Sequence, residues 1–296
     1  MTSSPSNEKE KKDFEAMTAA IYRDMWKLSG LPEDVFNARY RVGAVERMRG
    51  QHAAATSEKS DFIEGILTRM ASGNYIREWS YIGRGGRADY KVCLPSGRIA
   101  VIEAKGSMDG NSATILERPA YADELVIWTM TTNPMSDVVK NVWSGLHTRI
   151  SPEHIATGKR VDLVVAWDTL GSSLRLCPGL EALGPTGENG TSSPPCLYLL
   201  PTELPIVGAR PTVGAKRLHE VEFAQAAAEC FGIPERFVGM VQFEVAEKRD
   251  RLARRTTVIF GNEIWKQSSM TPLRRDLTAY RAAAEKELLD CKLETS

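Results

Sequence analysis

Hydrophobic residues recur at two different spacings along this chain, and the spacings predict where helices and strands lie. Residues 60–72 place apolar side chains three or four positions apart, as on one face of an amphipathic helix, with Ser60 as the N-cap. The same spacing predicts two earlier helices, at 14–30 and 32–50. Further on, apolar and polar positions alternate or β-branched residues dominate, and turns rich in Gly, Pro and Ser separate the segments. Three consecutive strands are predicted there, at 74–82, 88–94 and 98–105.

The later segments mix helices with strands. Residues 160–170 contain the apolar run Leu163 to Ala166, which is typical of a strand buried on both faces. Residues 178–195 are rich in Gly, Pro, Ser and Thr and are predicted to form a loop. The other expected elements are a helix at 135–150, a strand at 196–201, a helix at 220–232, a hairpin of 237–245 with 254–260, and a helix at 272–292. This order predicts an α/β (α+β) fold in which helices flank a mixed central sheet, with N-terminal helical and C-terminal α/β additions.

Composition narrows the class of protein. The chain has 296 residues, 42% hydrophobic and 26% charged, as in soluble globular proteins. No apolar run approaches the roughly 18 residues of a membrane span, and the polar N-terminus has no secretory h-region. A cytoplasmic location and no membrane partner are therefore expected. The five cysteines contain no CxxC pair, which favours reduced thiols. The formal net charge of zero still allows a local basic footprint for DNA.

Two charged residues interrupt the end of the apolar segment 98–105. Glu103 and Lys105 are two positions apart and share a face of the strand. An unpaired buried charge is costly, so this face must meet water, a partner or a metal. A hairpin that turns near residue 96 places Asp89 opposite roughly Glu103. Two carboxylates and one ammonium group are therefore expected at one end of the sheet.

This cluster suits a magnesium site. Two carboxylates about 4–6 Å apart can hold Mg²⁺ together with water and a substrate phosphate, and the carbonyl of Ala104 could be a third ligand. The ion would polarise a phosphoryl oxygen and activate a water molecule, and Mn²⁺ is expected to substitute for it. Lys105 would orient the water and stabilise the charge that develops in the transition state.

Asp89, followed after thirteen intervening residues by Glu103-Ala104-Lys105, resembles the motif of the PD-(D/E)xK nuclease superfamily, and type II restriction endonucleases in particular. The predicted order of helix, three strands, helix and strand over about residues 58–170 is similar to the core of that family. Ala88 stands where the family often has proline. The resemblance implies a restriction-endonuclease-like core with Asp89 and Glu103 as metal ligands and Lys105 as a catalytic residue. It also implies a catalytic role for Glu64, because a helix before the strands often supplies another acidic residue.

The resemblance also implies a division of the chain. Residues 1–12 are expected to be a disordered tail, and residues 13–57 an N-terminal helical region. Residues 58–175 would form the nuclease core. Residues 176–296 would complete the same domain, with the loop 178–195, and serve DNA recognition or dimerisation.

The tripeptide alone is a weak signal, because [DE]xK occurs four times in this chain. Only residues 103–105 end an apolar run, follow an acidic residue on the preceding strand and precede a glycine. Two alternatives remain open for these residues. One is an exposed ion pair between Glu103 and Lys105 on an edge strand, and the other is a site built on Asp89-Tyr90-Lys91 with Glu78. Glu64 could equally be a solvated helix residue.

Basic and polar residues near these strands are candidate DNA contacts. The glycine-rich residues 83–90 could let a phosphate approach the backbone, or they could be a flexible turn. Residues 110–119 would lie at the rim of a cleft. The basic stretch 247–255 is either a solvated hairpin tip or a ribbon that reads a DNA groove. The individual candidates are Arg84, Arg87, Asn111, Ser112, Arg118, Arg249 and Arg251.

The function predicted on these grounds is that of a Mg²⁺-dependent, sequence-specific endonuclease, a type II restriction enzyme, that hydrolyses phosphodiester bonds of double-stranded DNA. No helicase, P-loop or methyltransferase motif is present. The resemblance further implies a homodimer and products with a 5′-phosphate and a 3′-hydroxyl. Two alternatives keep the fold. They are a structure-specific nuclease of repair, recombination or transposition, and a non-catalytic DNA-binding protein.

Overall fold

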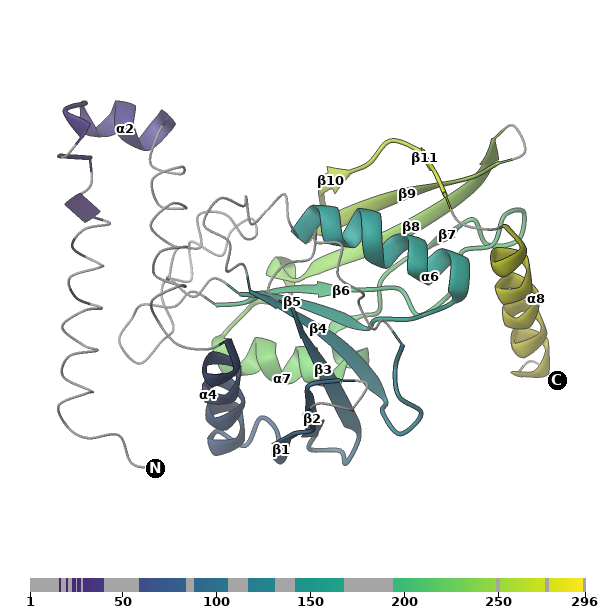
Figure 1. Cartoon of the computed structure of the whole chain (residues 1–296), viewed down its shortest axis with the longest axis horizontal. Helices are drawn as coiled ribbons and strands as arrows, with labels where there is room; N and C mark the ends of the chain where they lie inside the picture. Colours follow the sequence, from purple (N-terminus) through teal and green to yellow (C-terminus); the bar gives the residue numbers. More distant parts are fainter. Residues whose placement is uncertain are drawn as a thin grey trace.

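The computed structural model describes residues 29–39, 59–83, 88–105, 117–130, 142–167, 194–248, 251–274 and 277–294, together with six single positions between 16 and 27. Figure 1 shows a central sheet with helices on both faces. The predicted α/β class with a mixed sheet is confirmed in this part of the chain. The expected disordered tail, residues 1–12, lies outside the described residues, and so does nearly all of the loop 178–195. Of the helix expected at 32–50, the structure describes α2 (Glu33–Arg39).

The sheet is a single mixed one. In spatial order its main strands are β1 (Glu78–Tyr81), β2 (Tyr90–Cys93), β3 (Ile99–Lys105), β4 (Glu124–Met130), β5 (Leu163–Trp167), β6 (Cys196–Leu199), β8 (Gly239–Lys248), β9 (Arg251–Phe260) and β10 (Glu263–Gln267). Two short strands extend it, β7 (Thr212–Val213) beside β8 and β11 (Thr271–Pro272) beside β9. The strands β3, β4 and β5 are parallel, whereas β1, β2 and β3 form an antiparallel meander.

One strand departs from the expected order. The segment Glu124–Met130 forms β4, which lies between β3 and β5 and is parallel to both. The predicted order passes from the strand at 98–105 directly to the helix at 135–150, so it was wrong at this point. A parallel neighbour needs a crossover of about a dozen residues or more, and residues 106–123 are long enough for one.

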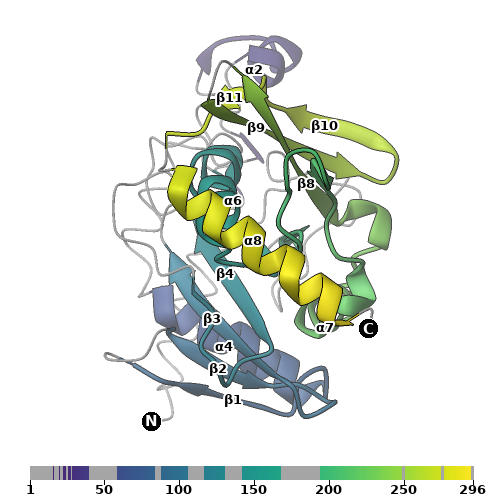
Figure 2. The ribbon, with the colours of Figure 1, turned by 90° about the vertical axis from the view of Figure 1, so that its right-hand side faces the viewer.

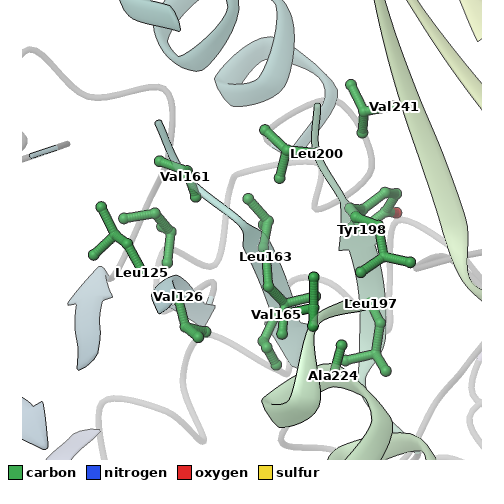
Figure 3. Packing of buried hydrophobic residues seen from close by; sticks show 14 of the residues in the cluster. Leu125, Val126, Val161, Leu163, Val165, Leu197, Tyr198, Leu200, Ala224 and Val241 are labelled. Atoms are coloured by element: carbon green, nitrogen blue, oxygen red, sulfur yellow. The ribbon is translucent and has the colours of Figure 1, made fainter. Parts of the chain in front are cut away.

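Helices cover the two faces of the sheet. On one face, α4 (Lys59–Ser72) and α7 (Glu222–Phe231) pack against β5. The rings of Phe62 from α4 and Phe231 from α7 both make edge-to-face contacts with Trp167 of β5. We call this the α4 face. On the opposite face, the α6 face, lie the π-helix η1 (Gly145–Ile150) and α6 (Ser151–Thr157), and His154 contacts Phe243 there. Buried aliphatic residues from β4, β5 and β6 form the core between these layers (Figure 3).

Pro152 explains why Arg254 of β9 forms a hydrogen bond with the helix made of η1 and α6. In η1 the N–H of Ser151 donates to the carbonyl of Leu146, five residues earlier. The next donor in this π register would be residue 152, which is proline and has no N–H. The guanidinium of Arg254 replaces it and donates to the carbonyl of His147 at 2.8 Å. Burial lowers the pKa of Arg254 to about 10. The helix was predicted to end at residue 150, but it continues through this π turn to Thr157.

The C-terminal region adds to the same sheet. The predicted hairpin is confirmed as β8 with β9, and the predicted last helix as α8 (Leu277–Glu294), which crosses in front of the sheet in Figure 2. The carboxylate of Glu287 anchors α8 because Arg160, Arg210 and the backbone N–H of Leu204 all donate to it. No helix among the described residues is long and apolar enough to cross a membrane.

The cysteines were predicted to be reduced, and the structure agrees with this prediction only in part. Cys93 and Cys230 are free, as predicted. Cys196 on β6 is instead disulfide-bonded. The expectation of reduced thiols throughout was therefore wrong at this position.

Candidate active site

The hairpin of β2 and β3 sets the relative positions of the predicted site residues. Tyr90 pairs with Ile102 and Cys93 with Ile99, and the backbone N–H of Asp89 donates to the carbonyl of Ile102 at 2.9 Å. The register predicted from the turn near residue 96 is confirmed for Tyr90–Cys93, where the ladder ends; one step further along the same register, Asp89 would face Glu103.

The carboxylate of Asp89 is held at the end of β3. Its Oδ2 atom accepts a hydrogen bond from the backbone N–H of Ala104 at 2.7 Å, and the side chain is half-buried. The N–H and the carbonyl of one strand residue point to the same side, so the carbonyl of Ala104 also points toward Asp89. The ladder between β2 and β3 ends at the pair Tyr90–Ile102, before it reaches Ala104. The side chain of Asp89 therefore takes the place of a ladder partner.

Glu103 and Lys105 form a largely buried ion pair. The Nζ atom of Lys105 lies 2.5 Å from Oε1 of Glu103, and Glu103 is only 8% exposed. The strand that carries them, β3, lies between β2 and β4. The alternative of an exposed pair on an edge strand is therefore wrong. Because Ala104 pairs with Trp128 on the α4 face, Glu103 and Lys105 point to the α6 face.

The second alternative, a site built on residues 89–91 with Glu78, also fails on register. Glu78 pairs with Cys93, at the end of β2 remote from Asp89, and is exposed. Four residues along a strand separate the two carboxylates by about 13 Å. The strands thus bring Asp89 to Glu103 and keep it apart from Glu78.

The pair lies at the carboxyl edge of the parallel strands. Glu103 and Lys105 are in register with Ile127 and Thr129 of β4, close to the end of that strand. Ligands of open α/β sheets bind in general beyond the carboxyl ends of the strands. The position of the pair is therefore one where a substrate can reach it.

Glu64 lies on the other side of the sheet. It is half-buried on α4, and that helix packs on the α4 face through Phe62, whose ring lies 5.4 Å from that of Trp167 at the end of β5. Glu103 points to the α6 face, so the structure does not bring these two carboxylates to one face of the sheet.

Two of the candidate DNA contacts, Arg118 and Arg251, lie in the described part of the chain. The structure does not bring Arg118 to the site, because its guanidinium donates to the carbonyl of Asp123 at 2.6 Å and lies 3.5 Å from Asp162, at the amino ends of β4 and β5. Arg251 is exposed at the end of the β8–β9 hairpin, where it pairs with Lys248. The remaining candidates, Arg84, Arg87, Asn111, Ser112 and Arg249, lie outside the described residues.

The donor atoms fit a magnesium ion in part. Among the described residues no group of three or more His, Cys, Asp and Glu side chains is arranged to hold a metal. At the end of β3, Asp89 accepts a hydrogen bond from the N–H of Ala104, and Glu103 is the residue next to Ala104, so the available donors are two carboxylates and one backbone carbonyl. All of them are oxygen donors, which Mg²⁺ and Mn²⁺ prefer, and Mg²⁺ commonly keeps several waters and takes the remaining ligands from a substrate phosphate.

His147 has a structural environment. Its Nδ1 atom lies 3.0 Å from the hydroxyl of Thr256, and its ring stacks on Trp143. Burial lowers the pKa of His147 to about 4, and the charge of Arg254 adds to this shift. His147 is therefore a neutral imidazole held against Thr256 of β9, which is a structural role.

Comparison of the chain with protein-family models, curated proteins and solved structures found no match. Any assignment of function therefore depends on the geometry of the site and on the resemblance of its motif.

Proposed function

We propose that this protein is a Mg²⁺-dependent endonuclease that hydrolyses phosphodiester bonds of double-stranded DNA. The observation that carries the proposal is the buried Glu103–Lys105 pair with Asp89 fixed opposite it, at the carboxyl edge of the parallel strands. An ion pair this close to the core contributes little net stability compared with apolar residues. A role in catalysis would explain why the Glu103–Lys105 pair is present at this place.

In the proposed mechanism Asp89, Glu103 and the carbonyl of Ala104 would hold the divalent cation, which supplies Lewis-acid polarisation of the scissile phosphate. Lys105 uses one of its three protons for Glu103 and can donate another to the attacking water. The water oxygen bonds to phosphorus as the bond from phosphorus to the 3′ oxygen breaks. The water gives up a proton to solvent and the departing 3′ oxygen takes one up, which leaves a 5′-phosphate and a 3′-hydroxyl. Glu64 would support a second ion or a water ligand from the α4 side.

Sequence specificity and dimerisation belong to the same proposal. We propose a type II restriction activity with a homodimer on a symmetric site, because a two-fold dimer can cut both strands of such a site. The exposed hairpin end at Lys248 and Arg251 suits contact with phosphates or with guanine edges.

The test is digestion of a sequenced phage genome by the purified protein with Mg²⁺, beside an EDTA control. Lys105→Ala is the test variant. Lys91→Ala is its matched control, because Lys91 is a half-buried lysine on the neighbouring strand β2 and belongs to the rejected register. Discrete fragments that are lost with EDTA and in Lys105→Ala, but kept in Lys91→Ala, support the proposal. A smear points to the structure-specific nuclease, and DNA binding without cleavage on methylated, unmethylated and branched substrates points to the non-catalytic protein.

A further inference from the structure

Thr129 places a buried hydroxyl group beside the catalytic lysine of the proposed site. It is the in-register partner of Lys105 on the parallel strand β4. Such partners lie about 4.8 Å apart and point to the same face, here the α6 face. Thr129 is 2% exposed, and its Oγ1 atom has no hydrogen-bond partner among the described residues.

Among the described residues, the neighbours of Thr129 offer its hydroxyl no hydrogen-bond partner. Its neighbour on β5 is Ala166, whose side chain has no polar atom. Buried polar atoms are nearly always hydrogen-bonded, so an orphaned one needs an explanation. A valine has the same shape and would avoid the desolvation penalty of the hydroxyl.

In the strands β1 to β6 the orphaned polar atoms lie at this edge, whereas β9 carries two more, the Nε atoms of Arg254 and Arg255. Within the described residues of the strands β1 to β6, the buried side-chain atoms without a partner are the indole nitrogens of Trp128 and Trp167 and the hydroxyl of Thr129. All three lie near the carboxyl ends of β4 and β5. Only the hydroxyl of Thr129 is on the α6 face with Glu103 and Lys105.

We infer that Thr129 is a positioning residue of this site, whose hydroxyl orients, together with the ammonium of Lys105, the water molecule that attacks the phosphate. The inference rests on the proposed function. Lys105 donates to the water oxygen, and Thr129 Oγ1 accepts one of the water protons. The two contacts fix the direction of the remaining lone pair, which is the pair that bonds to phosphorus. An effect of this kind changes the chemical step and leaves the affinity for DNA unaltered.

The experiment compares Thr129→Val, which removes only the hydroxyl, with Thr129→Ser, which keeps it. For Thr129→Val we expect kcat to fall by about 10- to 100-fold with KM and DNA affinity within about two-fold of wild type. The melting temperature in EDTA should stay the same or rise by up to about 3 °C, because a buried orphan donor has been removed. Thr129→Ser should keep most of the activity.

Three outcomes overturn the inference, and they are distinguishable. If wild type cleaves and Thr129→Val cleaves equally well, the hydroxyl has no part in the reaction. If Thr129→Val melts lower and Thr129→Ser restores the melting temperature, the hydroxyl is structural and bonds to a residue outside the described part. If wild type itself cuts no DNA, the proposed function fails and the inference fails with it.

Discussion

The carboxylates of Asp162 and Glu124 at the amino edge of the parallel strands differ from that of Asp89 at the carboxyl edge in how fully the protein satisfies their oxygens. At the amino edge, both carboxylate oxygens of Asp162 have partners. Oδ2 accepts a hydrogen bond from Leu125 N–H and forms an ion pair with Arg118, and Oδ1 forms an ion pair with Lys216. Both oxygens of Glu124 are engaged too, by the first N–H groups of α7 and by Arg98. At the carboxyl edge, Asp89 uses one oxygen, and its Oδ1 has no hydrogen-bond partner among the described residues.

On the proposed function, this difference separates acidic residues that serve the fold from acidic residues that serve the reaction. A carboxylate that serves the fold ends with its lone pairs satisfied by the protein, as Asp162 and Glu124 do. A carboxylate that serves a ligand must keep acceptor capacity, as Asp89 does. The comparison therefore predicts that substitutions at the amino edge reduce stability, whereas substitutions at the carboxyl edge reduce activity.

The largest effect is expected from Glu103→Gln, which keeps the shape of the side chain and removes its charge. Cleavage should fall by about 10³-fold, or ~4 kcal/mol in the activation barrier, because cation binding and the placement of Lys105 both depend on the charge. The melting temperature should stay within about 3 °C of wild type, because the amide can still accept a hydrogen bond from Lys105. Rate and stability would be measured on the same preparation. A folded variant that cuts as fast as wild type would remove Glu103 from the site.

Local sequence signals were sufficient for the part of the site that one hairpin builds. The turn at Pro95, Ser96 and Gly97 and the alternation of its flanks fix one register, because a slip by one residue would turn every side chain to the other face. Asp89, Glu103 and Ala104 could therefore be placed before the structure was known. The amphipathic helix α4 was predictable from its own periodicity, and β5 from its continuous apolar run.

Non-local pairing was not predictable in the same way. The apolar segment 124–130 has no period that separates helix from strand, so neither β4 nor the position of Thr129 beside Lys105 could be foreseen. Arg118 was expected at the rim of the site because it follows Lys105 in sequence. It lies at the opposite edge because the segment 117–123 leads into the amino end of β4. The π turn before Pro152 depends on Arg254, about a hundred residues later.

The largest loss of stability is expected at the amino edge, from Asp162→Ala. This change leaves the ammonium of Lys216 and the N–H of Leu125 without their acceptor in a buried place. Breaking one partner of a buried pair costs about 3–5 kcal/mol. The free energy of unfolding in urea measures it. The rate of cleavage per folded molecule should be unchanged, and a variant that is stable but inactive would contradict the division between the edges.

Glu124→Gln is the matched counterpart of Glu103→Gln, because it is the same substitution on the neighbouring strand at the other edge. We expect a loss of about 1–2 kcal/mol in the free energy of unfolding, since α7 loses the charge at its first N–H groups. Burial raises the pKa of Glu124, which means that keeping this carboxylate ionised inside the fold already costs free energy. Removing its charge should therefore destabilise the protein less than Asp162→Ala does. Cleavage should be unchanged. Equal losses of cleavage in the two variants would show that the edges are not functionally distinct.

The smallest effect is a dependence of stability on pH that arises away from both edges, at His154. This side chain is buried, its Nε2–H donates to the carbonyl of Glu203 at 2.8 Å, and burial lowers its pKa to about 4. Because the folded pKa is below the usual 6.5, the unfolded chain takes up the proton first as the pH falls. The stability that this residue contributes is thus fully present above pH 6.5 and is lost as the pH falls toward 4.

His147 adds to this loss in the same direction, and Glu124 opposes it because a raised carboxyl pKa favours the folded state as the pH falls. The contribution of His154 is therefore measured as the difference in urea unfolding between wild type and His154→Gln, with His219→Gln as the control at an exposed histidine. We expect that difference to change by on the order of 1 kcal/mol between pH 6.5 and pH 5. A difference that does not change with pH would mean that His154 takes up its proton equally well in the folded chain, and the core around it would then be open to water.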